Sequence, residues 1–267
     1  MANTKTATRN VWGDDVDLLL DREPQEAKPG HITRRNQNDL TDGEKTSFRN
    51  ALTRLIDTGF FGALVAIHED MTHRMHGSFT SSFVGFERFL PWHRAYLSRF
   101  GEALRGIDEN LFVPYWQWTV DREIPEWLDD FMPQGIPMPG GNRLDVERRV
   151  GVGEPEPPTL TSMQDIMAVD NWHEFVRRLE GVPFGAHNQV HVFIGGTMGS
   201  MLSPADPLFW LHHCEIDRRW AAWQQGHEGQ GPRVTGNDAI LDPWPETVED
   251  VLDMGALNYE YDTLELG

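Results

Sequence analysis

The 267-residue chain has a single cysteine, Cys214, and this scarcity excludes two classes of protein. One thiol cannot form an intrachain disulfide, and it cannot build the multi-thiolate site of a structural zinc protein. The chain also lacks a run of about 18 apolar residues, the length that a membrane-spanning helix requires. The sequence therefore predicts neither a disulfide framework nor a membrane partner.

Positive charge is scarce as well, because 23 Lys and Arg stand against 42 Asp and Glu, a formal net charge of −19. Such a surface repels phosphate backbones, so nucleic acid is excluded as an expected partner. The first residues, Met1 to Lys5, lack the apolar core of a secretory signal. The simplest expectation is a cytoplasmic protein, and export together with a partner protein stays open.

Histidine, in contrast, is concentrated in two groups, one in each half of the chain. The groups consist of His68, His73, His76 and His93, and of His187, His191, His212 and His213. A single buried histidine is most often a core residue satisfied by a hydrogen bond, but eight clustered histidines have no common structural purpose. The pattern therefore predicts metal binding.

Hydrophobic periodicity predicts helices that carry these histidines. A capping box at Thr41 and Glu44 should begin a helix that ends at Gly59. A second helix should run over residues 60–75, and a third should begin near Pro91, since proline suits the first helical position.

The second half of the chain gives comparable helical signals. Residues 172–179 and 187–193 have helical patterns, and a long helix should begin at Asp206 and Pro207 with His213 on its apolar face. Two segments look irregular: an N-terminal arm over residues 1–40 and a Pro/Gly-rich loop over residues 131–160. Because neither half looks complete alone, residues 1–267 should form one domain that is mainly α-helical, with long loops and little β structure.

The ligand types narrow the choice of metal. His187 and His191 are four residues apart, so on a helix both imidazoles can grip one ion. The Glu-x-x-His motif of carboxylate-bridged di-iron bundles is absent at His93, His187, His191 and His213. All-imidazole sites suit copper, zinc, iron or nickel, and three neutral histidines per ion leave positions open for chemistry. Two adjacent sites of this kind fit a dicopper centre that binds dioxygen.

A zinc peptidase is the rival interpretation. The segment His68-Glu69 followed by His73 has one residue too many for the His-Glu-x-x-His motif. Side chains five residues apart on a helix diverge by about 140°, so the two imidazoles cannot hold one ion. The peptidase interpretation is rejected.

Three segments resemble the signatures of the tyrosinase family. Phe89–Leu97 is similar to the copper-A signature, Ala186–His191 to the paired-histidine part of the copper-B site, and Asp206–Arg218 to its closing signature. Asn10–Trp12 and Tyr259–Tyr261 resemble the family's boundaries, so the match spans nearly the whole chain. The resemblance implies a four-helix-bundle core that holds two copper ions.

The resemblance also implies which histidines bind each ion. Copper A would take His68, His76 and His93, with His73 as the alternative to His76, and copper B would take His187, His191 and His213. Asn188 resembles the residue that, together with a glutamate, positions a water able to deprotonate a monophenol, and Glu180 is the expected glutamate. Phe209 would lie above copper A or against a bound ring.

The implied function is that of a tyrosinase, which uses dioxygen to ortho-hydroxylate monophenols and to oxidise o-diphenols to o-quinones. A catechol oxidase or o-aminophenol oxidase shares every motif and stays an alternative. A haemocyanin-like oxygen carrier is less favoured, because carriers cover the site with a further domain. The implied partners are a small phenolic substrate, dioxygen and, as in some bacterial relatives, a separate copper-delivering protein.

Overall fold

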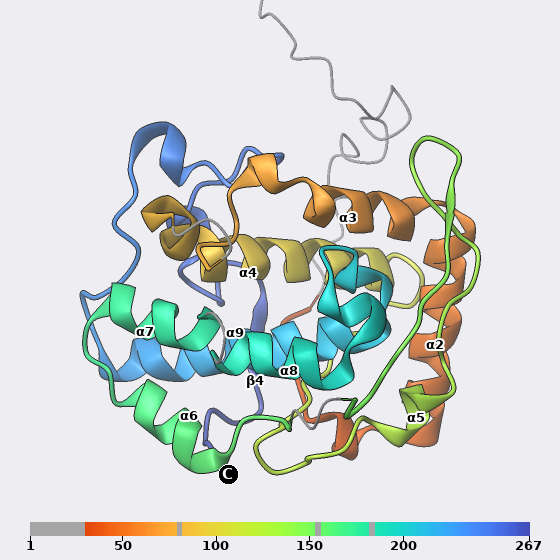
Figure 1. Ribbon diagram of the computed structural model, residues 1–267, viewed down its shortest axis with the longest axis horizontal. Coiled ribbons are helices and arrows are strands. Elements are labelled where there is room, and N and C mark those ends of the chain that lie inside the picture. The colour runs from red at the N-terminus through yellow and green to blue at the C-terminus, as the bar shows by residue number, and fades with distance from the viewer. Residues whose placement is uncertain (1–29, 79–81, 153–155, 182–184) are drawn as a thin grey trace, which may run out of the picture.

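The computed structural model describes residues 30–78, 82–152, 156–181 and 185–267, and in these ranges the chain is mainly α-helical (Figure 1). The α-helices are α2 (Asp42–Asp57), α3 (Phe60–Glu69), α4 (Phe83–Arg105), α5 (Glu126–Asp129), α6 (Leu160–Met167), α7 (Trp172–Glu180), α8 (Ala186–Ile194) and α9 (Pro207–Gly226). The 3-10 turns are η1 (Gln37–Asp39), η2 (Met71–His73), η3 (Gly196–Gly199), η4 (Ser203–Ala205), η5 (Gly236–Ala239) and η6 (Glu249–Val251).

The described strands form two short pairs. Strand β1 (Ile32–Arg34) pairs in parallel with β4 (Tyr259–Tyr261). Strands β2 (Ile136–Pro137) and β3 (Arg143–Leu144) form an antiparallel pair. Part of the segment expected to be an irregular arm is therefore a strand, because the distant β4 completes its hydrogen bonds, and residues 1–29 lie outside the described ranges. The expected irregular loop likewise contains a hairpin.

The predicted capping box is present at the start of α2. Thr41 Oγ1 accepts from the Glu44 backbone N–H at 3.2 Å, and Glu44 Oε2 accepts from the Thr41 backbone N–H at 2.8 Å. These two bonds satisfy amide groups that have no partner within the helix. This helix end was predictable because its signal is local.

The predicted end of the second helix is wrong. Helix α3 ends at Glu69 and not near Met75, because the Asp70 side chain accepts from the Thr72 backbone N–H at 2.9 Å and begins the turn η2. Arg74 then adopts φ 51°, a left-handed conformation that a helix cannot continue. His76 therefore lies on an irregular segment.

The predicted start of the third helix is also wrong, since α4 begins at Phe83. Ser82 caps it by accepting from the Gly85 backbone N–H at 3.2 Å. Pro91 lies inside the helix, where it removes the hydrogen bond to the carbonyl of Glu87. The buried face over residues 85–97 offsets that loss through packing.

The predicted four-helix core consists of α3, α4, α8 and α9, the helices that carry the clustered histidines. Helix α4 packs against α7 and α9, and α8 packs against α7 and α9. In Figure 1, α3 and α4 lie above α8 and α9, with α7 at one end. Within the described ranges no single helix has the length and apolar character to cross a membrane; α2 and α3 meet those criteria only as a pair, which is bent by 79°.

Candidate metal centre

The first histidine group consists of His68 on α3, His76 on the segment after η2, and His93 on α4. Each residue is at most 3% exposed. The Nε2 atoms of His68 and His76 lie 3.3 Å apart, and the His93 ring lies 5.6 Å from that of His68 and 5.1 Å from that of His76, measured between centroids. Three imidazoles thus converge on one point.

The second group consists of His187 and His191 on α8 with His212 and His213 on α9. His213 Nε2 lies 3.2 Å from His187 Nε2 and 3.4 Å from His191 Nε2. The ring of His212 stacks on that of His187 at 5.3 Å. The converging Nε2 atoms single out His213 of the adjacent pair.

The two groups face each other across the centre of the bundle. The rings of His93 and His213 are nearly parallel, 12° between planes, with centroids 4.4 Å apart. The rings of His76 and His187 lie 6.0 Å apart. Two ions held by these groups would be neighbours.

Hydrogen bonds at Nδ1 fix the tautomer of most of these histidines. The acceptors are Met201 O for His68 (2.8 Å), Glu180 Oε1 for His76 (3.2 Å), Phe89 O for His93 (2.7 Å), Asn188 Oδ1 for His187 (2.9 Å) and Met198 O for His191 (2.7 Å). Because an oxygen of this kind only accepts, each Nδ1 carries the proton and each Nε2 presents a lone pair to its neighbours. This is the arrangement of metal-binding histidines.

The surroundings also keep the imidazoles uncharged. Burial, followed by the charges of neighbouring histidines, holds the pKa of His68, His93, His187 and His213 well below the ordinary value. Burial lowers the pKa of His191 to about 4. Neutral imidazole is the form that binds a metal.

These residues fit two metal ions. The buried Nε2 of His93 has no hydrogen-bond partner among the described residues, and lone pairs that face each other in a buried site require a cation between them. An all-imidazole donor set suits copper. The sequence-based expectation of two metal sites, one in each half of the chain, is confirmed.

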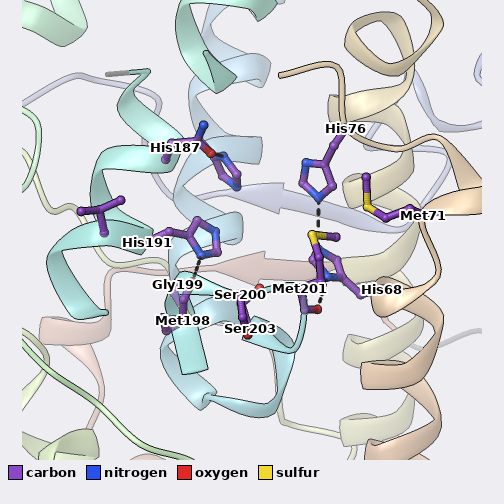
Figure 2. Close-up of a pocket in the computed structure, with 12 residues that line it drawn as sticks. His68, Met71, His76, His187, His191, Met198, Gly199, Ser200, Met201 and Ser203 are labelled. Atoms are coloured by element: carbon purple, nitrogen blue, oxygen red, sulfur yellow. Dashed lines mark hydrogen bonds between the residues drawn. The ribbon is translucent and has the colours of Figure 1, made fainter. Parts of the chain in front are cut away.

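A cavity of about 520 Å³ opens onto both groups (Figure 2). Its lining residues are His68, Met71, His76, His187, Asn188, His191, Val192, Met198, Gly199, Ser200, Met201 and Ser203. Apart from the histidines, the lining carries no ionisable side chain among the described residues. The cavity therefore suits a small aromatic molecule that reaches the metal centre.

The three residues expected to act in catalysis occupy different environments. Asn188 lines the cavity. Glu180 is fully buried, is not among the described lining residues, and accepts from His76, Gly77 and Ser78. Phe209 is also fully buried, with its ring 4.1 Å from that of His213, so it packs beside the centre and does not line the cavity.

His73, the alternative to His76, lies apart from the first group. Its Nδ1 is 2.8 Å from Asp242 Oδ2, and its Nε2 is 3.9 Å from Asp70 Oδ2. Its ring faces Trp92 at 6.4 Å. The structure brings His76, and not His73, to His68 and His93.

The turn that supplies two of the backbone acceptors was not predicted from the sequence. Gly195 and Gly196 adopt φ 61° and 58°, and a Cβ on Gly196 would lie 2.2 Å from Glu147 O. Only glycine fits that close approach, after which η3 places Met198 O against His191. The pair Gly195-Gly196 is a local signal that predicts a turn, whereas its contact with the distant Glu147 has no signal in the sequence.

Comparison with known proteins agrees with this geometry. A family model described as the common central domain of tyrosinase matches residues 58–154 and 142–226. A tyrosinase of Streptomyces antibioticus is 33% identical over 269 aligned positions, which cover 86% of this chain and 98% of that protein. A grixazone synthase of Streptomyces griseus is 28% identical with the same coverage of both chains.

Among solved structures, a functional unit of octopus hemocyanin superposes with a TM-score of 0.65 at 22% identity, covering 87% of this chain and 68% of that one. This likeness concerns the fold, and the sequence matches carry the family assignment. The chain therefore belongs to the tyrosinase family and is a copper-dependent phenol oxidase whose cofactor is a pair of copper ions.

Proposed function

We propose that this chain is a tyrosinase, which ortho-hydroxylates monophenols and oxidises o-diphenols to o-quinones with dioxygen. The observation that carries the proposal is the cavity, because two histidines of each group line it: His68, His76, His187 and His191. A phenol in this cavity would therefore reach both metal positions. The similarity to curated tyrosinases over nearly their whole length supports the same activity.

The six histidines His68, His76, His93, His187, His191 and His213 are the proposed ligands. When bound, the copper ions supply the redox chemistry by which dioxygen oxidises the phenol. The chain's own contribution is to aim the Nε2 lone pairs and to keep the imidazoles neutral in a largely apolar cavity.

Asn188 is the proposed contact for the phenol proton. It lines the cavity beside His187, and its orientation is fixed because its Nδ2 donates to Gly181 O at 2.9 Å. Its amide oxygen accepts from His187 and has a second lone pair for a water that receives the proton. Glu180, the expected partner of Asn188, accepts from donors of residues 76–78 and is not among the described lining residues of the cavity.

A narrower oxidase of catechols or o-aminophenols is the second candidate. The similarity to a grixazone synthase over 98% of that protein's length favours this candidate. It shows that a protein similar to this chain over most of its length can have an activity other than that of a tyrosinase. A copper-delivering partner is a further proposal, which stoichiometric loading from a free copper salt would contradict.

The decisive experiment assays copper-loaded protein with tyrosine, dihydroxyphenylalanine and an o-aminophenol, alongside metal analysis. Two copper ions per chain and turnover of both tyrosine and dihydroxyphenylalanine are expected. Turnover without tyrosine hydroxylation would replace the tyrosinase with the narrower oxidase. Reversible oxygen binding without any turnover would reject both enzymes.

A further inference from the structure

The end of α7 contacts both histidine groups through two consecutive residues, Glu180 and Gly181. Glu180 reaches His76 of the first group, and Gly181 reaches His187 of the second through Asn188. We propose that this junction is a shared support that fixes His76 and His187 relative to each other, and so sets the spacing of the two copper sites. The inference rests on the proposed dicopper centre.

The fully buried carboxylate of Glu180 accepts hydrogen bonds from three consecutive residues. Its Oε1 accepts from His76 Nδ1 at 3.2 Å, from the backbone N–H of Gly77 and of Ser78 at 3.1 Å each, and from Ser78 Oγ at 2.7 Å. A buried carboxylate requires such donors to offset its desolvation. The consequence is that α7 holds the backbone around His76 in place.

His76 depends on this support more than the other two members of its group do. His68 and His93 lie within α3 and α4, whose backbones are fixed by helical hydrogen bonds. The segment around His76 is irregular and tightly packed, since a Cβ on Gly77 would lie 2.3 Å from the Phe86 ring. A carboxylate from α7 substitutes for the regular structure that this segment lacks.

Gly181 supports the second group through backbone contacts. Its carbonyl accepts from Asn188 Nδ2 and from the Gly185 backbone N–H, both at 2.9 Å. Asn188 in turn accepts from His187 Nδ1 at 2.9 Å. A Cβ on Gly185 would lie 2.3 Å from Gly181 N, so the start of α8 abuts the end of α7 directly.

Glu180 thus acts through a histidine and is a positioning residue. It does not line the cavity, so a substrate there would meet Asn188 and not Glu180. Since Glu180 and Gly181 are consecutive, a shift of the α7 terminus moves the supports of both His76 and His187, whose rings lie 6.0 Å apart. Loss of the contact that supports His76 or His187 should weaken binding of the copper ion held by that histidine's group. Displacement of the α7 terminus from the start of α8 should change the spacing of the two copper ions and so uncouple them.

The first test removes one support at a time. Glu180→Ala and Asn188→Ala are titrated with copper and compared with His76→Ala and His187→Ala by metal analysis and electron paramagnetic resonance. A coupled Cu(II) pair gives no resonance signal, whereas a lone Cu(II) does. We expect one ion to bind about 10- to 100-fold more weakly in each variant. The spectrum of Glu180→Ala should match that of His76→Ala, and the spectrum of Asn188→Ala that of His187→Ala.

Glu87→Ala is the matched control for the loss of a buried carboxylate. Glu87 is also fully buried and accepts from His173 Nδ1 at 3.0 Å and from the Arg233 backbone N–H at 2.6 Å, and none of its hydrogen bonds with described residues involves either histidine group. This variant should lose stability and keep both copper ions. If Glu180→Ala does not fold, Glu180→Gln replaces it in the test, because the glutamine amide keeps one acceptor oxygen. The first histidine group of this variant should then bind its copper ion with an affinity between those of the wild type and of His76→Ala. Wild-type affinity for both ions in the Glu180 variant would overturn the proposal.

The second test displaces the start of α8 from the end of α7 by added bulk, without removing a polar side chain. Gly185→Ala forces a Cβ against Gly181 N, whereas Gly226→Ala adds one where nothing lies within 4 Å. The Gly185 variant should show a resonance signal from uncoupled copper, and the Gly226 variant should remain silent. A silent, fully loaded Gly185→Ala protein would contradict the shared support. Failure of the wild type itself to bind two ions would instead reject the dicopper function.

Discussion

Arg94 and Asp217 form a buried ion pair in which Arg94 Nε donates to Asp217 Oδ1 at 2.6 Å. Arg94 directly follows His93 on α4, and Asp217 lies one turn after His213 on α9. The pair therefore joins the two helices beside the closest contact between the histidine groups. Tyr259 and Tyr261 of β4 also donate to Asp217, at 2.7 and 2.6 Å, so the chain's last strand takes part in the same network.

Asp217→Asn should strongly destabilise the copper-free protein. Burial alone would raise the pKa of Asp217, but Arg94 and Arg34 hold it below its ordinary value, so the carboxylate is charged. Its neutralisation leaves Arg94 buried without a counter-charge, which costs about 3–5 kcal/mol. Urea unfolding measures the loss. Asp130→Asn is the control, because Asp130 is 75% exposed beside Arg49 and should cost less than about 1 kcal/mol. Equal losses would contradict a dominant role for the buried pair.

The copper-free protein should also lose stability on mild acidification. Burial lowers the pKa of His191 to about 4 and holds those of His68, His93, His187 and His213 well below the ordinary 6.5. Between pH 6.5 and about 4 the unfolded chain therefore binds more protons than the folded one, and stability falls as the pH falls.

Above pH 6.5 these histidines are neutral in both states, so their contribution is constant there. Each contributes at most about 1.4 kcal/mol per pH unit below it, and several act together. The urea midpoints of the copper-free protein at pH 7.5 and 5.5 test how its stability depends on pH. The copper-loaded protein should also lose copper as the pH falls, because protons compete with the metal for the histidine ligands. Equal midpoints, or full copper retention at pH 4, would count against neutral buried ligands.

The sequence predicted the parts of the centre that lie on regular helices. The start of α9 and the pairing of His187 with His191 have local signals of capping and period, as does the start of α2 outside the centre. The contact between Glu180 and His76 has no such signal, because 104 residues separate the two. Two helix boundaries were also mispredicted: at the end of α3 the Asp70 cap outweighed the apolar pattern, and at Pro91 tertiary packing outweighed the local rule.

His76→Ala should bind one copper ion per chain, whereas His73→Ala should bind two. The reason is geometric, because His76 Nε2 lies 3.3 Å from His68 Nε2, while His73 is paired with Asp242. Metal analysis after loading and desalting gives the two stoichiometries. A single ion in the His73 variant with two in the His76 variant would reverse the assignment.

The cavity should favour uncharged phenols, and Val192 offers a way to change that preference. Val192 lines the cavity and is 55% exposed. Without an Arg or Lys among the described lining residues, a substrate carboxylate finds no partner, and the net charge of −19 repels it. Val192→Arg should therefore raise kcat/KM for 3-(3,4-dihydroxyphenyl)propionate relative to 4-methylcatechol by up to about fivefold, the range of a partly exposed ion pair.

Val120→Arg separates a local contact from a general change of surface charge. Val120 is 60% exposed but does not line the cavity, so the same added charge there should leave the ratio of the two kcat/KM values unchanged. The gain in the Val192 variant should also shrink at high salt, because ions screen an exposed pair. If both variants shift the ratio equally, the selectivity arises from the overall field of the protein. If neither does, the carboxylate of the substrate lies away from α8.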